Sequence, residues 1–336
     1  MLEELKTLTS LQAVSGHEDA IINWLKNKHQ DVEFMQDNLG SLIFKIKGTH
    51  SNLKPQAIVC HMDEVGLVVS DILERGFIRF ECVGGLTLES LVNQRVMIGD
   101  HKGVILGNSA HLKKETQDIR DLVIDCGFES KEEALEKIRI GDMISFDNNY
   151  QQLSTHRILS KALDNRVGVL VISQLIDAFK QHPPKRDTYF CASVQEEIGL
   201  RGAKTLMSKL PDDLCRVVVV DVSPLDDYPE AVDNLSLGKG PLLRIKDPYM
   251  VFDYDLINKA RNLFEQWNIN YQPYFSKGGT DSASIQLAGS GKKVLAICVG
   301  ARNIHSNNSV IDVRDIKDTI TFLYKYLLEE DYEKQN

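Results

Sequence analysis

Alternation of short apolar runs with longer segments constrains the fold of this chain more than any other feature. The runs have the length of β-strands, and the segments between them have the length of helices. Beyond residue 160, the predicted order is helix 165–180, strand 188–194, helix 200–208, strand 216–221, strand 241–246, helix 253–267, strand 293–299 and helix 313–329. Strands joined by helices form a parallel or mixed sheet covered on both faces. The sequence therefore predicts an α/β fold with a mixed, largely parallel sheet sandwiched by helices.

The N-terminal segment predicts the same kind of structure. Ser15 and Glu18 have the spacing of a capping box, which predicts a helix that continues to about Lys28. The strands predicted after this helix are Val32–Met35, Leu42–Ile46 and Ala57–Cys60.

Between residues 68 and 153, a different sequence pattern interrupts the alternation of strands and helices. Short β-like pieces alternate with glycine turns, and the one clear helix is short and begins at Ser130, with Glu133 completing a capping box. We therefore predict two domains. Residues 1–67 and 154–336 form the α/β domain, and residues 68–153 form an inserted, β-barrel-like domain.

Charge and composition exclude several classes of partner. The formal net charge is −9, which disfavours nucleic acid and anionic membranes, because both bind a basic face. The apolar runs are far shorter than the roughly 18 residues of a membrane-spanning helix. The N-terminus lacks the pattern of a signal peptide, and the six cysteines are scattered without paired spacing. We expect a cytoplasmic protein with reduced thiols.

Histidines and carboxylates gather where the predicted strands end. In open α/β sheets, ligands bind beyond the carboxyl ends of the strands. The residues that follow apolar runs, or open the helix at residue 165, are His61, Asp63, Asp164, Glu196, Glu197, Asp221 and His305. Taken alone, Asp164 is better explained as a helix cap, and the adjacent glutamates as a solvated turn. Their convergence on one sheet edge instead indicates a metal site.

The residue types favour particular ions. Two histidines with three carboxylates suit Zn²⁺ or Co²⁺, with Mn²⁺ as a further candidate, better than Ca²⁺. One carboxylate shared between two ions, with two further ligands on each side, describes a two-metal hydrolytic site. In extended chain, neighbouring glutamates point in opposite directions, so that one can bind metal while the other handles a proton.

Seven motifs resemble one family of peptidases over essentially the whole chain. They are HMDEVG (61–66), KALDNRVG (161–168), VQEEIGLRGA (194–203), VVDVS (219–223), LGKGPLLRIKD (237–247), GGTDSASIQLA (278–288) and IHS (304–306). This pattern resembles metallopeptidase family forty-two, the glutamyl and deblocking aminopeptidases that form tetrahedral assemblies, some of whose members carry the label endoglucanase. Two stretches of the insert, 83–96 and 122–146, also match.

The resemblance implies a role for each candidate residue. Asp164 would bridge two divalent ions in each subunit, and the peptide bond after it would be cis. His61 and Asp221 would complete one metal site, and Glu197 and His305 the other. The catalytic residues implied are Glu196, as general base, and Asp63, which would orient His61.

The same resemblance implies a function and an assembly. The chain would be a metallo-aminopeptidase, a hydrolase that removes N-terminal residues from short peptides through a metal-bridging water activated by Glu196. The insert would drive dimerisation, and the dimers would build a homododecamer. Three alternatives stay open at this point. They are a related dinuclear N-deacylase or peptidase, a glycoside hydrolase, and a catalytically silent oligomeric binding protein of the same fold.

Overall fold

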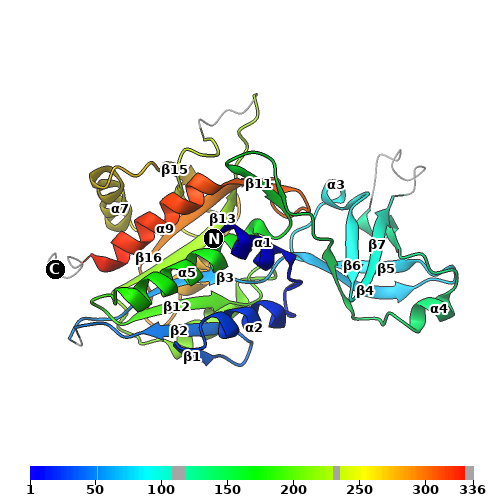
Figure 1. Cartoon of the computed structure of the whole chain (residues 1–336), viewed down its shortest axis with the longest axis horizontal. Coiled ribbons are helices and arrows are strands. Elements are labelled where there is room, and N and C mark those ends of the chain that lie inside the picture. The colour runs from blue at the N-terminus through cyan, green and yellow to red at the C-terminus, as the bar shows by residue number, and fades with distance from the viewer. Residues whose placement is uncertain (51, 108–117, 230–234, 330–336) are drawn as a thin grey trace.

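The computed structural model describes residues 1–50, 52–107, 118–229 and 235–329. The described chain forms two parts, a large sheet covered by helices and a smaller closed barrel at one end of the molecule (Figure 1). Both parts agree with the fold class predicted from the sequence.

The large sheet has eleven strands, and its centre is parallel. The nine strands on its main path are, in spatial order, β1 (Glu33–Gln36), β2 (Leu42–Ile46), β12 (Thr188–Ser193), β3 (Gln56–His61), β13 (Arg216–Pro224), β16 (Val294–Arg302), β17 (Ser309–Asp312), β11 (Arg157–Ser160) and β10 (Gln151–Gln152). Strands β12, β3, β13 and β16 run parallel, whereas the strands outside them pair antiparallel. Two further strands, β14 (Leu242–Lys246) and β15 (Gln272–Phe275), pair beside β16.

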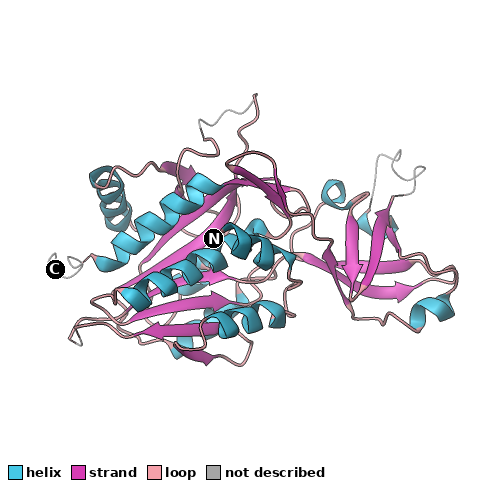
Figure 2. Ribbon diagram, viewed as in Figure 1, coloured by secondary structure: helices cyan, strands magenta, loops and turns pink. Residues whose placement is uncertain are grey.

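Burial explains why the central strands read as unbroken apolar runs. All six residues of β3 and all six of β12 are buried, because both faces of the sheet are covered. Helices α5 and α9 lie side by side across one face of the sheet (Figures 1 and 2). The helices are α1 (Leu2–Ser10), α2 (Asp19–Lys28), α3 (Leu88–Leu91), α4 (Lys131–Leu135), α5 (Leu163–Gln181), α6 (Arg201–Leu206), α7 (Tyr254–Gln266), α8 (Ser282–Gln286) and α9 (Val313–Leu328), with 3₁₀ turns η1 (Ile119–Asp121) and η2 (Met207–Lys209).

The barrel closes in the strand order β4-β5-β8-β7-β6-β9. Its strands are β4 (Gly66–Ile72), β5 (Ile78–Val83), β6 (Arg95–Ile98), β7 (His101–Leu106), β8 (Val123–Asp125) and β9 (Met143–Phe146). Neighbouring strands are antiparallel, so one face of each strand fills a common apolar core. Closure leaves no free sheet edge among the described strands of the barrel.

Most predicted elements are present, and their ends differ from the predicted ends by at most three residues. The capping box at Ser15 is wrong. Helix α2 begins at Asp19 without a side-chain cap, and the Ser15 hydroxyl donates instead to Asp63 at 2.5 Å. Ser130 does cap α4, accepting from the Glu133 backbone N–H at 3.2 Å, while the Glu133 side chain accepts from Glu129.

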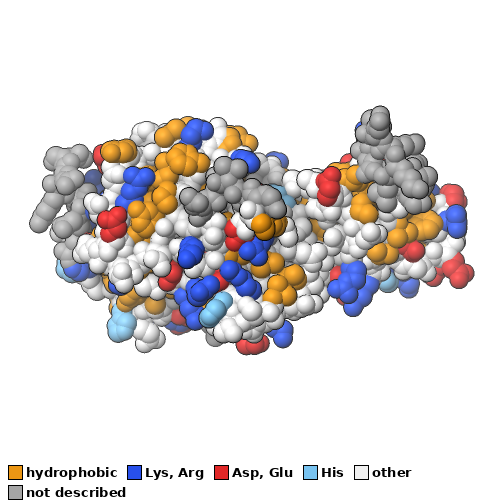
Figure 3. All heavy atoms as spheres, turned by 90° about the horizontal axis from the view of Figure 1, so that it is seen from above, with side chains coloured by type: hydrophobic (Ala, Val, Ile, Leu, Met, Phe, Trp, Pro, Cys, Tyr) orange, Lys and Arg blue, Asp and Glu red, His pale blue; other side chains and the backbone are white. Residues whose placement is uncertain are grey.

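Acidic and basic side chains are interspersed over both parts of the molecule on the face drawn in Figure 3. Within the described residues, no helix combines the length and the apolar character that crossing a bilayer requires.

Candidate metal centre

The predicted ligands converge at the carboxyl ends of the parallel strands. Strands β3 and β13 pair in register at Val59 and Val219, which brings Asp221 level with His61. The side chains that meet there are His61 at the end of β3, Asp164 at the start of α5, Glu197 after β12, Asp221 in β13 and His305 after β16.

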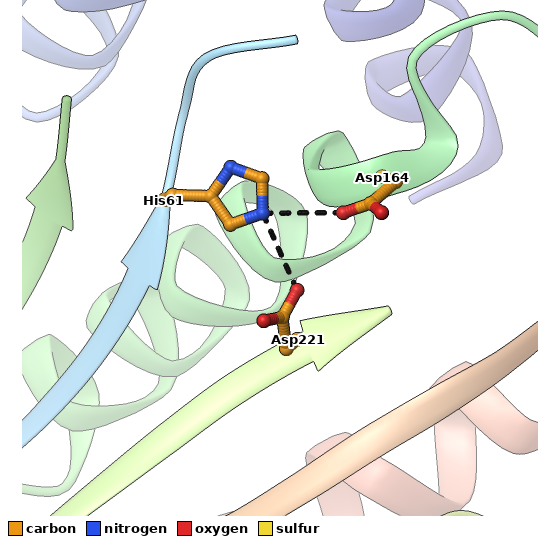
Figure 4. A group of neighbouring side chains, drawn as sticks. All are labelled: His61, Asp164 and Asp221. Carbon is orange, nitrogen blue, oxygen red and sulfur yellow. Dashed lines mark hydrogen bonds and ion pairs between the residues drawn. The ribbon is translucent and has the colours of Figure 1, made fainter. Parts of the chain in front are cut away.

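The first group of side chains consists of His61, Asp164 and Asp221, and it is buried. His61 Nε2 lies 3.1 Å from Asp164 Oδ1 and 3.3 Å from Asp221 Oδ1 (Figure 4). One ligand atom from each residue lies within 4.8 Å of the other two. This geometry gives one nitrogen and two oxygen donors around one point.

The second group consists of Asp164, Glu197 and His305. His305 Nε2 lies 3.2 Å from Glu197 Oε2 and 3.6 Å from Asp164 Oδ2. Asp164 therefore presents its two oxygens to different groups, Oδ1 to the first and Oδ2 to the second. A carboxylate shared in this way is the arrangement that a pair of ions needs.

Local structure at the start of α5 aims Asp164 into the cleft. The Asp164–Asn165 peptide bond is cis, as the resemblance implied, and both residues depart from helical dihedral angles. Asn165 Nδ2 donates to the Val220 carbonyl at 2.9 Å, which ties the helix start to β13. A Cβ on Gly168 would lie 2.7 Å from Cys60 Cβ, so only glycine lets α5 approach β3 this closely.

His305 is oriented by its backbone and by a contact from the loop after β5. Its φ of 54° lies in the left-handed region, and Ala162 and Gln195, near two other site residues, share that region. His305 Nδ1 lies 2.8 Å from the Gly85 carbonyl oxygen. Donation from Nδ1–H to that carbonyl leaves Nε2 as the free acceptor, which is the tautomer that a metal ligand requires.

Asp63 is fully buried behind the two groups. It accepts hydrogen bonds from the backbone N–H groups of Glu196 and Glu197 at 3.0 and 3.2 Å, and His61 Nδ1 lies 3.4 Å from its Oδ1. Burial raises its pKa, but the contacts with His61 and Ser15 outweigh burial and lower it overall. Asp63 thus lies against His61 and holds the backbone that carries the two glutamates.

Electrostatics at the site are dominated by crowded carboxylates. Burial raises the pKa of Glu196 well above its usual value; His61 opposes this shift, and Asp221 and Glu197 add to it. Burial alone would lower the pKa of His305, yet its contacts with Asp164 and Glu197 raise it to about 11. A divalent ion bound between these groups would take the place of a proton on His305 Nε2 and would favour the ionised carboxylates.

The donor set fits a divalent metal pair. Two imidazoles and three carboxylates are the ligands that Zn²⁺ and Co²⁺ prefer. In addition, Glu197 Oε1 is buried with no hydrogen-bond partner among the described residues. A bound cation would satisfy that oxygen and neutralise the crowded carboxylates.

Glu196 lines the open side of the site. A cleft of about 470 Å³ is bounded by both groups of side chains and by Glu196. A carboxylate with a raised pKa beside a cleft is a candidate for proton transfer.

Sequence reasoning missed several residues that support the site. Glu64, Lys161 and Arg166 form a buried charged cluster, and the Ser193 hydroxyl hydrogen-bonds the buried Asp281 carboxylate. All except Ser193 lie inside the matched motifs, so the motifs were the available signal. Their contacts depend on segments far apart in the sequence, which no local pattern specifies.

The fold and site together define a hydrolase of the metallopeptidase class, and comparison with known proteins identifies the family. Residues 40–322 match the family model described as M42 glutamyl aminopeptidase. The chain belongs to this family and is an aminopeptidase, a hydrolase that acts on the N-terminal bonds of peptides.

Individual relatives match over their full length. The glutamyl aminopeptidase of Lactococcus lactis subsp. cremoris is 33% identical, covering 99% of this chain and 98% of that protein. The solved structure of aminopeptidase APDkam598 from the archaeon Desulfurococcus kamchatkensis has a TM-score of 0.92 at 32% identity, covering 98% of this chain and 95% of that one. The TET1 peptidase of Pyrococcus horikoshii, described as assembling into a tetrahedron or a large octahedral shell, has a TM-score of 0.87 at 29% identity, covering 98% and 99%.

Proposed function

We propose that this aminopeptidase works with two divalent ions bound in the cleft. His61 and Asp221 would hold one ion, Glu197 and His305 would hold the other, and Asp164 would bridge them. The observation that carries the proposal is that the two oxygens of Asp164 face separate histidine-containing groups, at 3.1 and 3.6 Å from the histidine nitrogens. Zn²⁺ and Co²⁺ suit this ligand set best, and Mn²⁺ is a further candidate.

Glu196 is proposed as the general base. Bound in the cleft, the ions would lower the pKa of water and polarise the scissile carbonyl. Glu196 would accept a proton from the attacking water and return it to the leaving amine. Asp63 would keep His61 in the tautomer that presents Nε2 to the ion, and would hold the backbone of Glu196 through the 3.0 Å hydrogen bond.

Short peptides are the proposed substrates. A cleft of about 470 Å³ suits a few residues of extended peptide rather than a folded protein. Because the ligands lie in this cleft, the neutral α-amine of a peptide could bind one of the ions held there, which would account for action at the N-terminus.

The barrel is proposed as an assembly module. We propose domain boundaries at 1–67 with 154–336 for the catalytic domain and 68–153 for the inserted domain, which would pair two subunits. The assembly of the TET1 peptidase supports a further step, from dimers to a tetrahedral dodecamer, in a cytoplasmic protein. Analytical ultracentrifugation tests this, because a stable monomer at micromolar concentration would exclude the assembly.

Metal content and hydrolysis of aminoacyl-anilides, measured together, test the proposed function. We expect two ions per chain, loss of activity on chelation, and recovery when Zn²⁺ or Co²⁺ is added back. Glu196→Gln is expected to retain both ions and to lose roughly 10²- to 10⁴-fold in kcat, because only proton transfer is removed. Glu197→Gln is the contrasting variant, since it is expected to lose metal.

The activity of Glu196→Gln and the metal content of the wild type test the general base and the metal centre separately. Near-normal kcat in Glu196→Gln would refute the general base and leave the metal centre standing. A wild-type protein that binds no metal would refute the metal centre itself.

A further inference from the structure

A buried charged cluster lies directly behind the candidate metal centre and takes no part in the proposed chemistry. It consists of Glu64, Lys161 and Arg166, which are at most 1% exposed. Lys161 Nζ donates to the two Glu64 oxygens at 2.9 and 2.8 Å, and Arg166 Nη2 donates to Glu64 Oε1 at 3.0 Å. Among the described residues, Glu64 is the one carboxylate in ion-pair contact with either cation.

The cluster joins three segments of the chain. Glu64 Oε1 also accepts from the Ala13 backbone N–H at 3.0 Å. Lys161 Nζ donates to the Leu11 carbonyl at 3.2 Å, and Arg166 Nε donates to the Leu8 carbonyl at 3.2 Å. One carboxylate therefore fixes the N-terminal segment, the end of β3 and the start of α5 relative to one another.

The two cations stand next to residues of the metal centre. Glu64 directly follows Asp63, while Lys161 precedes Asp164 by three residues and Arg166 follows it by two. Burial lowers the pKa of Arg166, and the carboxylates that oppose this shift are, in decreasing order, Glu64, Asp63, Glu18 and Asp164. Arg166 Nη1 also donates to the Met62 carbonyl, which lies between His61 and Asp63 in the chain, so the guanidinium is held against the end of β3.

We propose that Glu64 is a positioning residue that holds Lys161 and Arg166 and thereby keeps Asp164 and Asp63 available to the metal centre. The inference rests on the proposed metal centre. Without the Glu64 charge, two buried cations lose their ion-pair partner, and an unpaired buried cation is costly. Arg166 would turn to Asp63 and Asp164 and compete there with the divalent ions, and Lys161, three residues before Asp164, would add its unpaired charge beside them.

Glu64→Gln tests the competition, because it removes the charge and keeps the size of the side chain. We expect Zn²⁺ affinity, measured by competition with a chromogenic chelator, to fall by roughly 10- to 100-fold, as for other residues that support metal ligands. The visible absorption bands of the Co²⁺-loaded protein should change as well, because they report the geometry around the ion. Unchanged Zn²⁺ affinity and an unchanged Co²⁺ spectrum would overturn the inference.

Removal of a competing cation should reverse the defect. In Glu64→Gln/Lys161→Met, we expect most of the lost Zn²⁺ affinity to return, and Lys161→Met alone should bind Zn²⁺ nearly as the wild type does. A merely structural role for Glu64 predicts the opposite, since the double variant would then be at least as impaired as the single one. Failure of the double variant to recover would therefore also overturn the inference.

A matched control separates this effect from general loss of a buried carboxylate. Asp315 is 1% exposed and accepts backbone hydrogen bonds from Gly238 and Gly240 at 2.7 and 2.8 Å. Asp315→Asn should leave Zn²⁺ affinity unchanged; a loss equal to that of Glu64→Gln would contradict a specific role for Glu64.

Should Glu64→Gln not fold, Glu64→Asp replaces it: the carboxylate is kept but withdrawn from Lys161, so a smaller loss of Zn²⁺ affinity than for loss of the charge, and its recovery with Lys161→Met, are expected. Wild-type protein without metal would refute the proposed function. Wild-type protein with two ions, and Glu64 variants that bind them equally well, would refute only the inference.

Discussion

The two parts of the molecule bury different chemistry. In the described residues of the barrel, from β4 to β9, the buried side chains are apolar except for Ser145. The large-sheet part buries many ionisable groups in addition to its apolar core. The acidic, basic and histidine side chains among them that are at most 2% exposed are His29, His61, Asp63, Glu64, Lys161, Arg166, Arg186, Arg216, Arg244, Asp247, Asp281, Asp312 and Asp315.

The barrel core thus contributes stability, whereas the large-sheet part holds the candidate functional groups. An apolar core stabilises the barrel by removing hydrocarbon from water, and it demands no partner for a buried charge. The large-sheet part must pair or solvate every buried charge, and the carboxylates at its strand ends remain crowded. Buried ionisable side chains whose pKa values are shifted by burial and by neighbouring charges are typical of active sites.

Of the changes compared between the two parts, Asp164→Asn in the large-sheet part should have the largest effect on metal content and kcat/KM. The change removes the charge that both groups of ligands share, so we expect loss of bound metal and a fall in kcat/KM of at least about 10³-fold. Metal content by atomic emission and hydrolysis of aminoacyl-anilides measure both effects.

The matched change in the barrel is Asp125→Asn. Asp125 Oδ1 accepts from the Gly127 backbone N–H at 2.8 Å, which an asparagine oxygen can also do. We expect metal content and kcat/KM to stay at wild-type values. Comparable losses in the two variants would erase the functional distinction between the parts.

His29 should make the stability of the large-sheet part depend on pH. His29 is fully buried, with Nε2 2.9 Å from Ser173 Oγ. Burial lowers its pKa to about 4, although Asp177 opposes the shift. Between about pH 6.5 and pH 4, the unfolded state binds the proton and the folded state does not, so stability falls as the pH falls.

His29→Gln removes this titration. Relative to the variant, the wild type should lose at most about 3 kcal/mol of unfolding free energy between pH 7 and pH 4. Urea unfolding of chelator-treated protein at several pH values measures the difference, since chelation removes the pH dependence of metal binding. A constant difference between the two proteins across that range would show that His29 does not titrate as inferred.

Ile124→Val should produce the smallest effect. Ile124 is fully buried in the barrel core, where it pairs with Ile78 and Ile105. Loss of one methylene group should lower the unfolding free energy by about 1 kcal/mol, without a change in Zn²⁺ affinity or kcat/KM. Thermal unfolding and the anilide assay measure these quantities; a change in metal affinity would link the barrel core to the site.

The central strands of the large sheet were predictable because apolar residues occupy both of their faces. Strands β3, β12 and β13 are buried on both faces, so they appear in the sequence as continuous apolar runs. The short elements β15, β17 and α8 were not predicted. Each has only four or five residues, too few for a period to emerge, and forms because longer neighbours offer it a surface.

The candidate site was predictable at the level of residues and not of contacts. His61, Asp221, His305 and the two glutamates follow apolar runs, and Asp164 opens a helix. Ser15 illustrates the limit, since its local spacing indicated a helix cap while its hydroxyl donates to Asp63, forty-eight residues away. A residue with two available partners chooses between them only in the folded chain.

The sequence by itself determined the fold class, the family and the set of chemically capable side chains, because apolar runs and motifs are local in the chain. Only the tertiary structure decided that the two oxygens of Asp164 face different histidines, that Gly85 orients His305, and that Glu64 holds Lys161 and Arg166. These contacts join segments that are distant in the sequence. Their geometry follows from the packing of α5 and the surrounding loops on the sheet, which no local pattern encodes.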